Sequence, residues 1–394
     1  MHTVIVGGGF AGVKAAIELA KKNIGKVTLI SDEPHFLHHA TLYSTATGRS
    51  HEESVVPLET IFAPYPNVTV VQDRMKSIDP RRKLVVGKKK NYTYQTLILA
   101  IGVVTTYFNI DGMAKHSYGI KTLKEVKKFN TALHDFVIKD QRYDANYVVI
   151  GAGPTGVELA GALAEYLTKI GEAHHLKRKK AKLLLVEAAP RILPRSSETA
   201  SSKVQAQLEK LGVKVMTNSK VQALDDDFIY INGKKVPTHT AVWTSGVANH
   251  PFFAEHADYF KLAPNGRVLV NQYLEAYPGI YVIGDNASTK YTGVAWNALD
   301  DATFVADHLA RKVAKRPLKT RRATSPPSGI PVGETYAYVE WHGVYASGRL
   351  GAWLRRRIEL VGFKQLLPRH AAIKAWRAHD KPEEHCRLCK NSEA

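Results

Sequence analysis

The feature that most limits how this chain can fold is a glycine-rich turn that occurs twice. Residues 7–12 read Gly-Gly-Gly-Phe-Ala-Gly and residues 151–156 read Gly-Ala-Gly-Pro-Thr-Gly. Each turn follows a short apolar run typical of a buried strand and leads into apolar residues at helical spacing, over 11–22 and 155–167. Another apolar run follows each helix. We therefore expect two βαβ units with parallel strands, each able to hold a dinucleotide.

Each glycine of the G-x-G-x-x-G pattern has its own physical role. The first permits a tight turn, the second lets backbone amides approach a pyrophosphate, and the third allows the helix to pack closely on the strand. The N-terminus of the helix adds partial positive charge. The predicted cofactor-binding residues of the two turns are Gly7, Gly9, Phe10, Ala11, Gly12, Gly151, Gly153, Pro154, Thr155 and Gly156.

The two units differ at the end of their second strand. In the second unit Glu187 stands there, where a carboxylate can accept both ribose hydroxyls and disfavours a 2′-phosphate. NADH is therefore expected in preference to NADPH. The first unit has Ser31 at this position, followed by Asp32 and Glu33, and we assign the ribose contact there to Asp32.

A third motif is a strand that ends in Gly-Asp, within residues 279–287. The carboxylate of Asp285 is a candidate partner for a ribityl hydroxyl of a flavin. Together with the two turns, an apolar strand at 96–102 and a turn at 244–246, this motif resembles the two-dinucleotide-binding-domain flavoproteins. The resemblance implies FAD in the first unit and a nicotinamide dinucleotide in the second. On the FAD side the resemblance adds Ala100, Gly102, Asp285 and Ala295 as cofactor-binding residues. On the NAD side it adds Gly246.

The resemblance becomes specific to the type II NADH dehydrogenases, which are single-subunit NADH:quinone oxidoreductases of membrane surfaces. Residues 43–48 are similar to the family's Tyr-x-x-Ala-Thr-Gly run, and residues 156–161 look like its nicotinamide-side helix. Residues 361–363 and Trp376 resemble its membrane-associated tail. The family implies that two electrons pass from NADH through FAD to a quinone without proton pumping.

Glu158, on the nicotinamide-side helix, is the candidate catalytic residue, with a positioning role beside the nicotinamide. The alternative is an ordinary glutamate on the helix surface. No nucleophile or catalytic triad is expected, because in this class the cofactors carry out the chemistry.

One segment departs from the family pattern. The family's quinone motif, Ala-Gln-x-x-x-Gln, corresponds to residues 295–300, where Trp296 and Asp300 replace the two glutamines. Both residues are expected on the acceptor side of the flavin, so a quinone binds differently or the acceptor is another molecule. The alternative for Trp296 is simple packing beneath the flavin.

The number and positions of the cysteines exclude two related classes of flavoprotein. Only Cys386 and Cys389 occur, whereas disulfide reductases and sulfide:quinone reductases of this architecture need cysteines earlier in the chain. This Cys-x-x-Cys is a dithiol, half of a zinc site or an idle pair. A zinc site would need His379 and His385, or a second subunit, and no metal is predicted.

Two rival functions stay open at this point. One is a soluble NADH-dependent reductase of a small acidic redox protein, of the ferredoxin or rubredoxin type. The other is a sensor that uses FAD and NADH for regulation and engages nucleic acid. The net charge of +19 is compatible with three kinds of anionic partner: acidic lipids, nucleic acid or a charged protein. Of these three, we do not expect nucleic acid.

The expected fold class is α/β, with two Rossmann-type domains and a C-terminal region that contains an amphipathic helix. The FAD domain spans 1–112 and 244–315, the NAD domain (113–243) is inserted in it, and the C-terminal region covers 332–394, after a polar linker at 315–331. The chain start lacks the pattern of a signal peptide, and no run reaches the roughly 18 apolar residues of a membrane span. We expect a cytoplasmic protein.

The C-terminal region is expected to attach the protein to the inner face of a membrane. Apolar residues recur there at helical spacing, at Leu350, Leu354, Ile358 and Val361. Arg355, Arg356 and Glu359 are expected to form a charged, mainly basic flank, and Trp376 is expected to extend the apolar surface. A core helix or the interface of a homodimer is the alternative.

Overall fold

The first glycine turn lies at the end of an inner strand of a six-stranded sheet. In sheet order the strands are β19 (Glu275–Tyr277), β20 (Ile280–Val282), β9 (Thr96–Leu99), β1 (His2–Val6), β2 (Lys26–Ser31) and β5 (Val68–Gln72). All neighbours are parallel except β19 with β20. Helix α1 (Phe10–Lys22) joins β1 to β2, and helix α9 (Ala295–Val313) packs along α1.

The second glycine turn has the same place in a smaller sheet. In sheet order its strands are β13 (Val213–Met216), β12 (Lys182–Val186), β11 (Asn146–Ile150) and β17 (Thr240–Trp243), and all neighbours are parallel. Helix α6 (Pro154–Ala173) joins β11 to β12, and α7 (Glu198–Lys210) joins β12 to β13. The two sheets share one core topology, which confirms the expected duplication.

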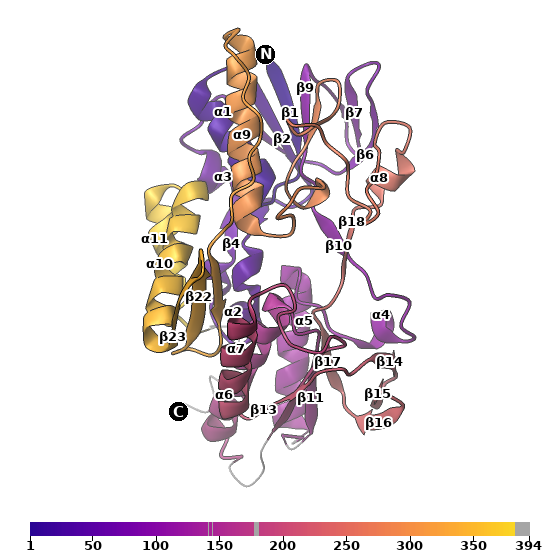
Figure 1. Ribbon diagram of the computed structural model, residues 1–394, viewed down its shortest axis with the longest axis vertical. Helices are drawn as coiled ribbons and strands as arrows, with labels where there is room; N and C mark the ends of the chain where they lie inside the picture. Colours follow the sequence, from indigo (N-terminus) through magenta and orange to yellow (C-terminus); the bar gives the residue numbers. More distant parts are fainter. Residues whose placement is uncertain (141, 144, 177–180, 383–394) are drawn as a thin grey trace.

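The computed structural model describes residues 1–140, 142–143, 145–176 and 181–382. The six-stranded sheet forms the centre of a first lobe and the four-stranded sheet that of a second lobe, stacked along the long axis (Figure 1). The chain crosses between the lobes through β10 (Val103–Thr105) and β18 (Val247–Asn249), which pair with each other in antiparallel fashion. We infer domain boundaries near this ribbon, after residues 112 and 243.

Each lobe also carries a three-stranded antiparallel sheet. The first lobe has β6 (Met75–Asp79), β7 (Leu84–Gly87) and β8 (Asn91–Thr93), and the second has β14 (Val221–Leu224), β15 (Phe228–Ile231) and β16 (Lys234–Pro237). Residues 67–71 and 83–86 each alternate between apolar and polar side chains, a sequence pattern that predicts antiparallel strands. The prediction is confirmed for 83–86 by β7 but is wrong for 67–71. These residues fall mostly in β5, which is parallel to β2 at the sheet edge. Partial exposure, not strand direction, explains its alternating pattern.

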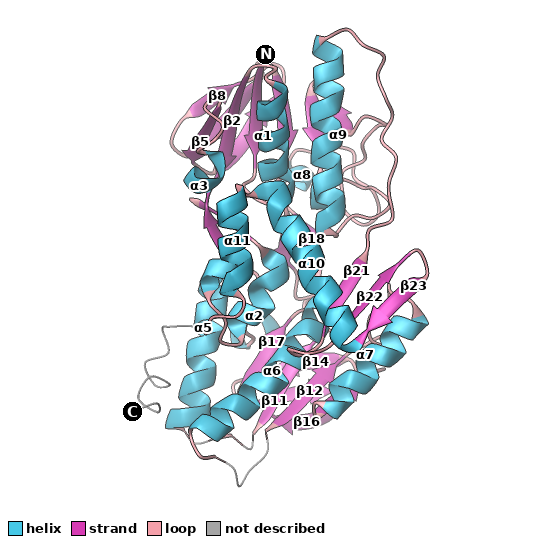
Figure 2. Ribbon diagram, turned by 90° about the vertical axis from the view of Figure 1, so that its left-hand side faces the viewer, coloured by secondary structure: helices cyan, strands magenta, loops and turns pink. Residues whose placement is uncertain are grey.

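The last described residues form a small sheet and two helices. They are β21 (Ser328–Pro331), β22 (Ala337–Trp341), β23 (Val344–Ser347), α10 (Gly348–Leu366) and α11 (Arg369–Ala378). Figure 2 shows α10 running across the junction between the lobes. The linker predicted over 315–331 is too long, because its last four residues pair with β22. No helix among the described residues is long and apolar enough to cross a bilayer.

Shorter elements complete the lobes. They are β3 (His35–Leu37), α2 (Leu42–Ala46), β4 (Val55–Pro57), α3 (Leu58–Phe62), α4 (Met113–His116), α5 (Leu123–His134) and α8 (Phe252–Glu255).

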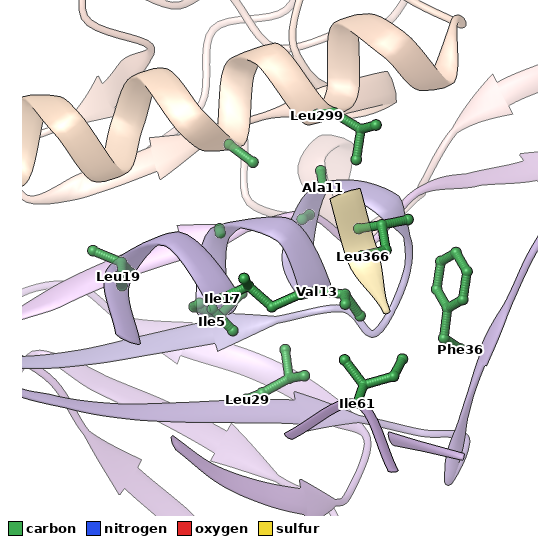
Figure 3. Packing of buried hydrophobic residues seen from close by; sticks show 14 of the residues in the cluster. Ile5, Ala11, Val13, Ile17, Leu19, Leu29, Phe36, Ile61, Leu299 and Leu366 are labelled. Atoms are coloured by element: carbon green, nitrogen blue, oxygen red, sulfur yellow. The ribbon is translucent and has the colours of Figure 1, made fainter. Parts of the chain in front are cut away.

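The C-terminal half of α10 is part of the first lobe's core. Leu366 lies beside Phe36 and Ala11 in the packed interior (Figure 3). Phe363 is fully buried, and its ring lies 4.5 Å from the ring of His38. Burying each such apolar side chain contributes about 2 kcal/mol. These contacts hold α10 firmly on the first lobe.

The predicted helix at the C-terminus is confirmed, but its charged face is not where it was expected. Leu350 and Val361 are 61% and 50% exposed, whereas the Glu359 carboxyl is buried and paired with Arg356 at 2.8 Å. Trp376 does not extend the exposed apolar surface either, because its ring packs against Arg356 at 4.6 Å. Helical periodicity reveals two faces, and only tertiary packing decides which one is covered.

Candidate functional site

The first glycine turn has the shape that a bound pyrophosphate requires. Gly7 has φ +114°, and a β-carbon there would lie 2.1 Å from the carbonyl oxygen of Ala100. A β-carbon on Gly12 would lie 1.9 Å from the carbonyl oxygen of Gly7. By contrast, a β-carbon on Gly9 would meet nothing within 4 Å. The turn is therefore closed against the sheet and open at its central glycine.

The second turn repeats this geometry. Gly151 has φ +101°, a β-carbon on Gly156 would lie 1.8 Å from the carbonyl oxygen of Gly151, and the space at Gly153 is open. Pro154 and Thr155, which begin α6, are exposed. Neither α1 nor α6 has a side-chain cap at its N-terminus. The amides at the start of α1, and those of Thr155 and Gly156 after Pro154 in α6, are thus available to an anion.

The residue that follows the second strand of the βαβ unit differs between the two lobes. The strand registers Val6 with Ile30 and Ile150 with Val186 make Ser31 the counterpart of Glu187. The carboxylate of Glu187 accepts hydrogen bonds from the amides of Ala152 and Ala189 at 2.7 and 2.8 Å, so it lies directly over the glycine turn.

The first lobe has a different arrangement at this place. The hydroxyl of Ser31 donates to the carbonyl oxygen of Glu33 at 2.8 Å. Asp32 is half exposed and forms an ion pair with Arg74 at 3.0 Å. To contact a ribose as proposed, Asp32 therefore has to share or give up its ion pair with Arg74.

Asp285 lies where the two lobes meet. Its negative charge acts on His39, Lys121 and Arg267, and it accepts a hydrogen bond from the amide of Gly293 at 3.1 Å. Burial lowers the pKa of Lys121, whose ammonium group lies 3.5 Å from the carbonyl oxygen of Gly246. Lys121 thus links the predicted NAD-side Gly246 with the predicted FAD-side Asp285. The sequence contained no signal for this residue, since an isolated lysine after a loop is common.

Asn286, the residue after Asp285, is a second structural link that the sequence did not reveal. Its fully buried side-chain amide accepts a hydrogen bond from the N–H of Gly102 at 2.9 Å and donates one to the C=O of Gly102 at 2.6 Å. It also donates to Asn249 in β18 at 2.8 Å. This one side chain joins the predicted FAD-side residue Gly102 to the Gly-Asp strand and to the ribbon between the lobes.

The start of α9 holds the residues predicted for the acceptor side. Ala295 and Trp296 are partly buried in its first turn. The carboxylate of Asp300 accepts a hydrogen bond from Thr324 at 2.6 Å and lies 3.8 Å from Arg321, so it contacts the segment that follows α9. Asn297 is buried, and its amide oxygen has no hydrogen-bond partner among the described residues. An orphaned acceptor of this kind fits a donor supplied by a ligand.

Glu158 is partly buried between the lobes and the C-terminal region. Burial raises the pKa of its carboxyl to about 8, the positive charge of Arg355 opposes this rise, and Glu359 adds to it. Glu158 therefore holds a proton at neutral pH. The alternative of an ordinary surface glutamate does not fit the structure, because the side chain is partly buried beside the charged groups of Arg355 and Glu359.

The site fits two dinucleotides by its own geometry. Each lobe has a glycine turn with open space at the central glycine, an uncapped helix, and polar groups beyond it. No cluster of three or more potential metal ligands occurs among residues 1–140, 142–143, 145–176 and 181–382. Cys386 and Cys389 lie outside the described residues.

Comparison with known proteins agrees with this arrangement. Residues 1–302 match the family model described as pyridine nucleotide-disulphide oxidoreductase, so the chain belongs to this class of two-dinucleotide enzymes. It is 30% identical over 338 residues to a type II NADH:quinone oxidoreductase of Mycobacterium tuberculosis, covering 79% of this chain and 73% of the relative. A type II NADH:quinone oxidoreductase of Staphylococcus epidermidis is 29% identical over 300 residues, covering 72% and 73%.

A solved structure extends the likeness to nearly the whole fold. The structure of NDH2 from Plasmodium falciparum in complex with NADH covers 96% of this chain and 97% of its own, with a TM-score of 0.86 and 17% identity. Within its class, this chain is a member of the type II NADH:quinone oxidoreductase family.

Proposed function

We propose that this protein oxidises NADH and passes two electrons through bound FAD to a quinone, without pumping protons. The observation that carries the proposal is the pair of open glycine turns at matched positions of two lobes, in a chain that aligns with type II NADH:quinone oxidoreductases over most of its length. FAD, when bound, accepts a hydride from the nicotinamide and passes on two electrons.

The protein's contribution is to bind and orient. In the first lobe, the amides around Gly9 and the start of α1 receive the pyrophosphate of FAD, and Asp285 and Asp32 contact its sugar hydroxyls. In the second lobe, the amides around Gly153 receive the pyrophosphate of NADH, and Glu187 binds the adenosine ribose. Glu158, protonated at neutral pH, is proposed to position the nicotinamide side of the site.

The acceptor is proposed to bind near the start of α9, next to Trp296. The broad apolar ring of Trp296 suits a flat quinone head group, and the orphaned amide oxygen of Asn297 lies one residue further along the chain. Asp300 has a lesser part in this proposal, since Thr324 and Arg321 already engage its carboxylate.

Anaerobic stopped-flow spectroscopy tests the proposal directly. NADH should bleach the flavin of the FAD-loaded protein rapidly, and a soluble quinone should restore its absorbance rapidly. Glu158→Gln should slow the bleaching, and Glu125→Gln, in a capping box on the helix α5, is a control. Rapid bleaching with recovery only by an acidic redox protein would instead establish the rival, a soluble reductase. Absence of bleaching would overturn the proposal.

We further propose that the protein binds the inner face of a membrane through an exposed apolar patch. The patch, which we name the apolar platform, consists of Trp341, Val344, Tyr345, Leu350, Trp353 and Val361. Its side chains are 48–76% exposed, and they belong to β22, β23 and α10. Exposed basic residues border it at Arg349, Arg357 and Lys364. Apolar side chains with cationic neighbours suit an anionic lipid surface.

Sedimentation with anionic vesicles tests this attachment. The wild type should sediment with the vesicles, and the double variant Leu350→Ser with Trp353→Ser should remain in solution. A control is Leu318→Ser, which removes an exposed leucine outside the platform. A homodimer that buries the platform would show itself as a doubled mass in solution, lost in the same double variant, with no binding to vesicles.

A further inference from the structure

An aromatic side chain is exposed to solvent in the loop between β10 and α4, where the chain passes from the first lobe to the second (Figure 1). The side chain of Phe108 is 62% exposed, although large apolar side chains are usually buried. Phe108 and Asn109 have φ values of +50° and +55°. A positive φ is uncommon outside glycine, and in a bulky residue it costs free energy. Backbone strain and an exposed ring therefore coincide at this one residue.

Hydrogen bonds to the second lobe hold this loop in its strained shape. The indole Nε1 of Trp243, the last residue of β17, donates to the carbonyl oxygen of Thr106 at 3.0 Å. The amide of Thr106 donates to the carbonyl oxygen of Gly246 at 3.3 Å. The hydroxyl of Thr106 accepts a hydrogen bond from the amide of Phe108, also at 3.3 Å. The position of the aromatic ring is thus imposed by the surrounding fold.

The ring of Phe108 lies against Gly246. A β-carbon on Gly246 would lie 2.7 Å from Cε2 of the ring and 2.7 Å from the carbonyl oxygen of Thr106. Only glycine leaves room for so close an approach. The next residue, Val247, is 47% exposed, so a second uncovered apolar side chain adjoins the same glycine. Together these residues form a small apolar surface at the end of β17.

This surface adjoins the predicted path of NADH. The hydroxyl of Thr244 donates to the carbonyl oxygen of Gly151 at 2.9 Å, so the turn at 244–246 packs on the glycine turn of the second lobe. In the sheet, β17 and β12 lie on opposite sides of β11, and Glu187 follows β12. A dinucleotide with its adenosine ribose at Glu187 and its pyrophosphate at the glycine turn therefore has its nicotinamide half at the end of β17.

We propose that the ring of Phe108 packs against the nicotinamide riboside of NADH and holds it in place for hydride transfer. The inference rests on the proposed function and adds a binding residue to it. The contact would remove from water an apolar ring that is now mostly exposed. The strained loop orders the ring in advance, so that binding does not have to do so. Phe108 supplies contact area and shape, with no acid or base, and acts on the nicotinamide half alone.

Binding measurements on the FAD-loaded protein test this contact without turnover. Calorimetry compares NAD⁺, which does not reduce the flavin, with ADP, which lacks the nicotinamide riboside. In Phe108→Ala, NAD⁺ should bind about tenfold more weakly, whereas ADP should bind as in the wild type. Phe108→Leu keeps apolar bulk and should recover most of the lost affinity. The control is Val313→Ala, which trims another exposed apolar side chain, at the far end of α9.

Thermal unfolding separates a binding role from a structural one. Glycine adopts a positive φ without strain, so Phe108→Gly should not melt below the wild type. The same variant should bind NAD⁺ as weakly as Phe108→Ala does. A ring with a purely structural role predicts the opposite pattern, a lower melting temperature with unchanged affinity for NAD⁺.

Anaerobic stopped-flow spectroscopy tests the consequence for the reaction. In Phe108→Ala, bleaching of the flavin at saturating NADH should slow at least about fivefold, because the nicotinamide is held less firmly. Reoxidation of the reduced flavin by ferricyanide should keep its rate, since this step needs no nicotinamide. Slowing of both steps alike would contradict the assigned role.

The remaining outcomes are distinct from one another. Unchanged affinity for NAD⁺ in Phe108→Ala would overturn the contact. Equal weakening of NAD⁺ and ADP would also overturn it, because the substitution would then have disturbed the whole second lobe. Failure of NADH to bleach the flavin of the wild type would refute the proposed function itself, whereas failure of the contact alone leaves wild-type bleaching intact.

Discussion

The two lobes have the same glycine turn but differ in the side chains around it. The backbone conditions recur at each matched glycine, with close approach at the third and open space at the second. After the second strand, however, the first lobe has Ser31 and the second has Glu187. Two residues after the third glycine, the first lobe has Lys14 and the second has Glu158.

Both of these last residues face α10. The ammonium group of Lys14 lies 3.4 Å from the carbonyl oxygen of Gln365, and Glu158 interacts with Arg355 and Glu359. The comparison teaches that the backbone provides a general phosphate site in each lobe, whereas a few side chains determine which ligand each lobe takes.

The largest effects are expected when the glycine turn of one lobe is disrupted at a time, which tests whether the two lobes bind their ligands independently. In Gly12→Ala and Gly156→Ala, the new methyl group would lie 1.9 and 1.8 Å from a carbonyl oxygen. Each change should cost about 3 kcal/mol of stability, since the helix must move off the strand. Gly12→Ala should lose FAD, whereas Gly156→Ala should keep FAD and lose NADH binding. Flavin content and thermal unfolding measure this, with Gly362→Ala, whose methyl meets nothing within 4 Å, as control. Loss of FAD in Gly156→Ala would show that the lobes are not independent.

A second test concerns the matched pair Lys14 and Glu158. The folded protein raises the pKa of Glu158 from 4.5 to about 8, so between these pH values the folded state binds more protons than the unfolded state. Wild-type stability therefore falls as pH rises through this window. Glu158→Gln removes this loss, and relative to wild type it should gain about 2 kcal/mol between pH 5 and pH 8, a value reduced for the partial solvent exposure of the side chain.

Urea unfolding at several pH values measures this effect. Parallel stability curves for the wild type and Glu158→Gln would contradict the raised pKa. Lys14→Met serves as the matched variant in the first lobe: because it retains Glu158, its stability should fall with rising pH in parallel with the wild type.

A third test concerns the residue that follows the second strand, Ser31 in the first lobe and Glu187 in the second. Glu187→Gln should weaken NADH binding about tenfold, which corresponds to about 1.4 kcal/mol, because one charged partner of the ribose is lost. The preference over NADPH should shrink as well. Titration with both nucleotides measures this. Ser31→Ala, the counterpart in the first lobe, should leave NADH binding unchanged, and an equal loss in both variants would remove the assigned role of Glu187.

The smallest effect is expected at Asp32. Asp32→Asn should weaken FAD binding about threefold, or about 0.6 kcal/mol, because the side chain is half exposed and already paired with Arg74. FAD release during dialysis measures this. A loss as large as that of Glu187→Gln for NADH would make the two lobes equivalent at this position.

The local part of this molecule could be predicted and the long-range part could not. Glycine turns, strands and helices follow from neighbouring residues, so Gly7 to Gly12 and Gly151 to Gly156 were recognisable. Asn286 and Lys121 were missed because their roles depend on partners far away in the chain, such as Gly102 and Gly246. The burial of the charged flank of α10 was missed for the same reason, since Arg356 and Glu359 approach Glu53 and His379 only in the folded protein.

The insertion of the second lobe has a consequence for synthesis on the ribosome. The sheet of the first lobe needs β20 at residues 280–282, which is translated after the entire second lobe. The second lobe can therefore complete its own sheet, which ends with β17, while the first lobe still lacks a strand and the helix α9. Its half-built sheet leaves β9 as an unpaired edge during this interval. The half of the protein that emerges first is finished last, and nascent chains paused before residue 280 should be the ones that bind chaperones.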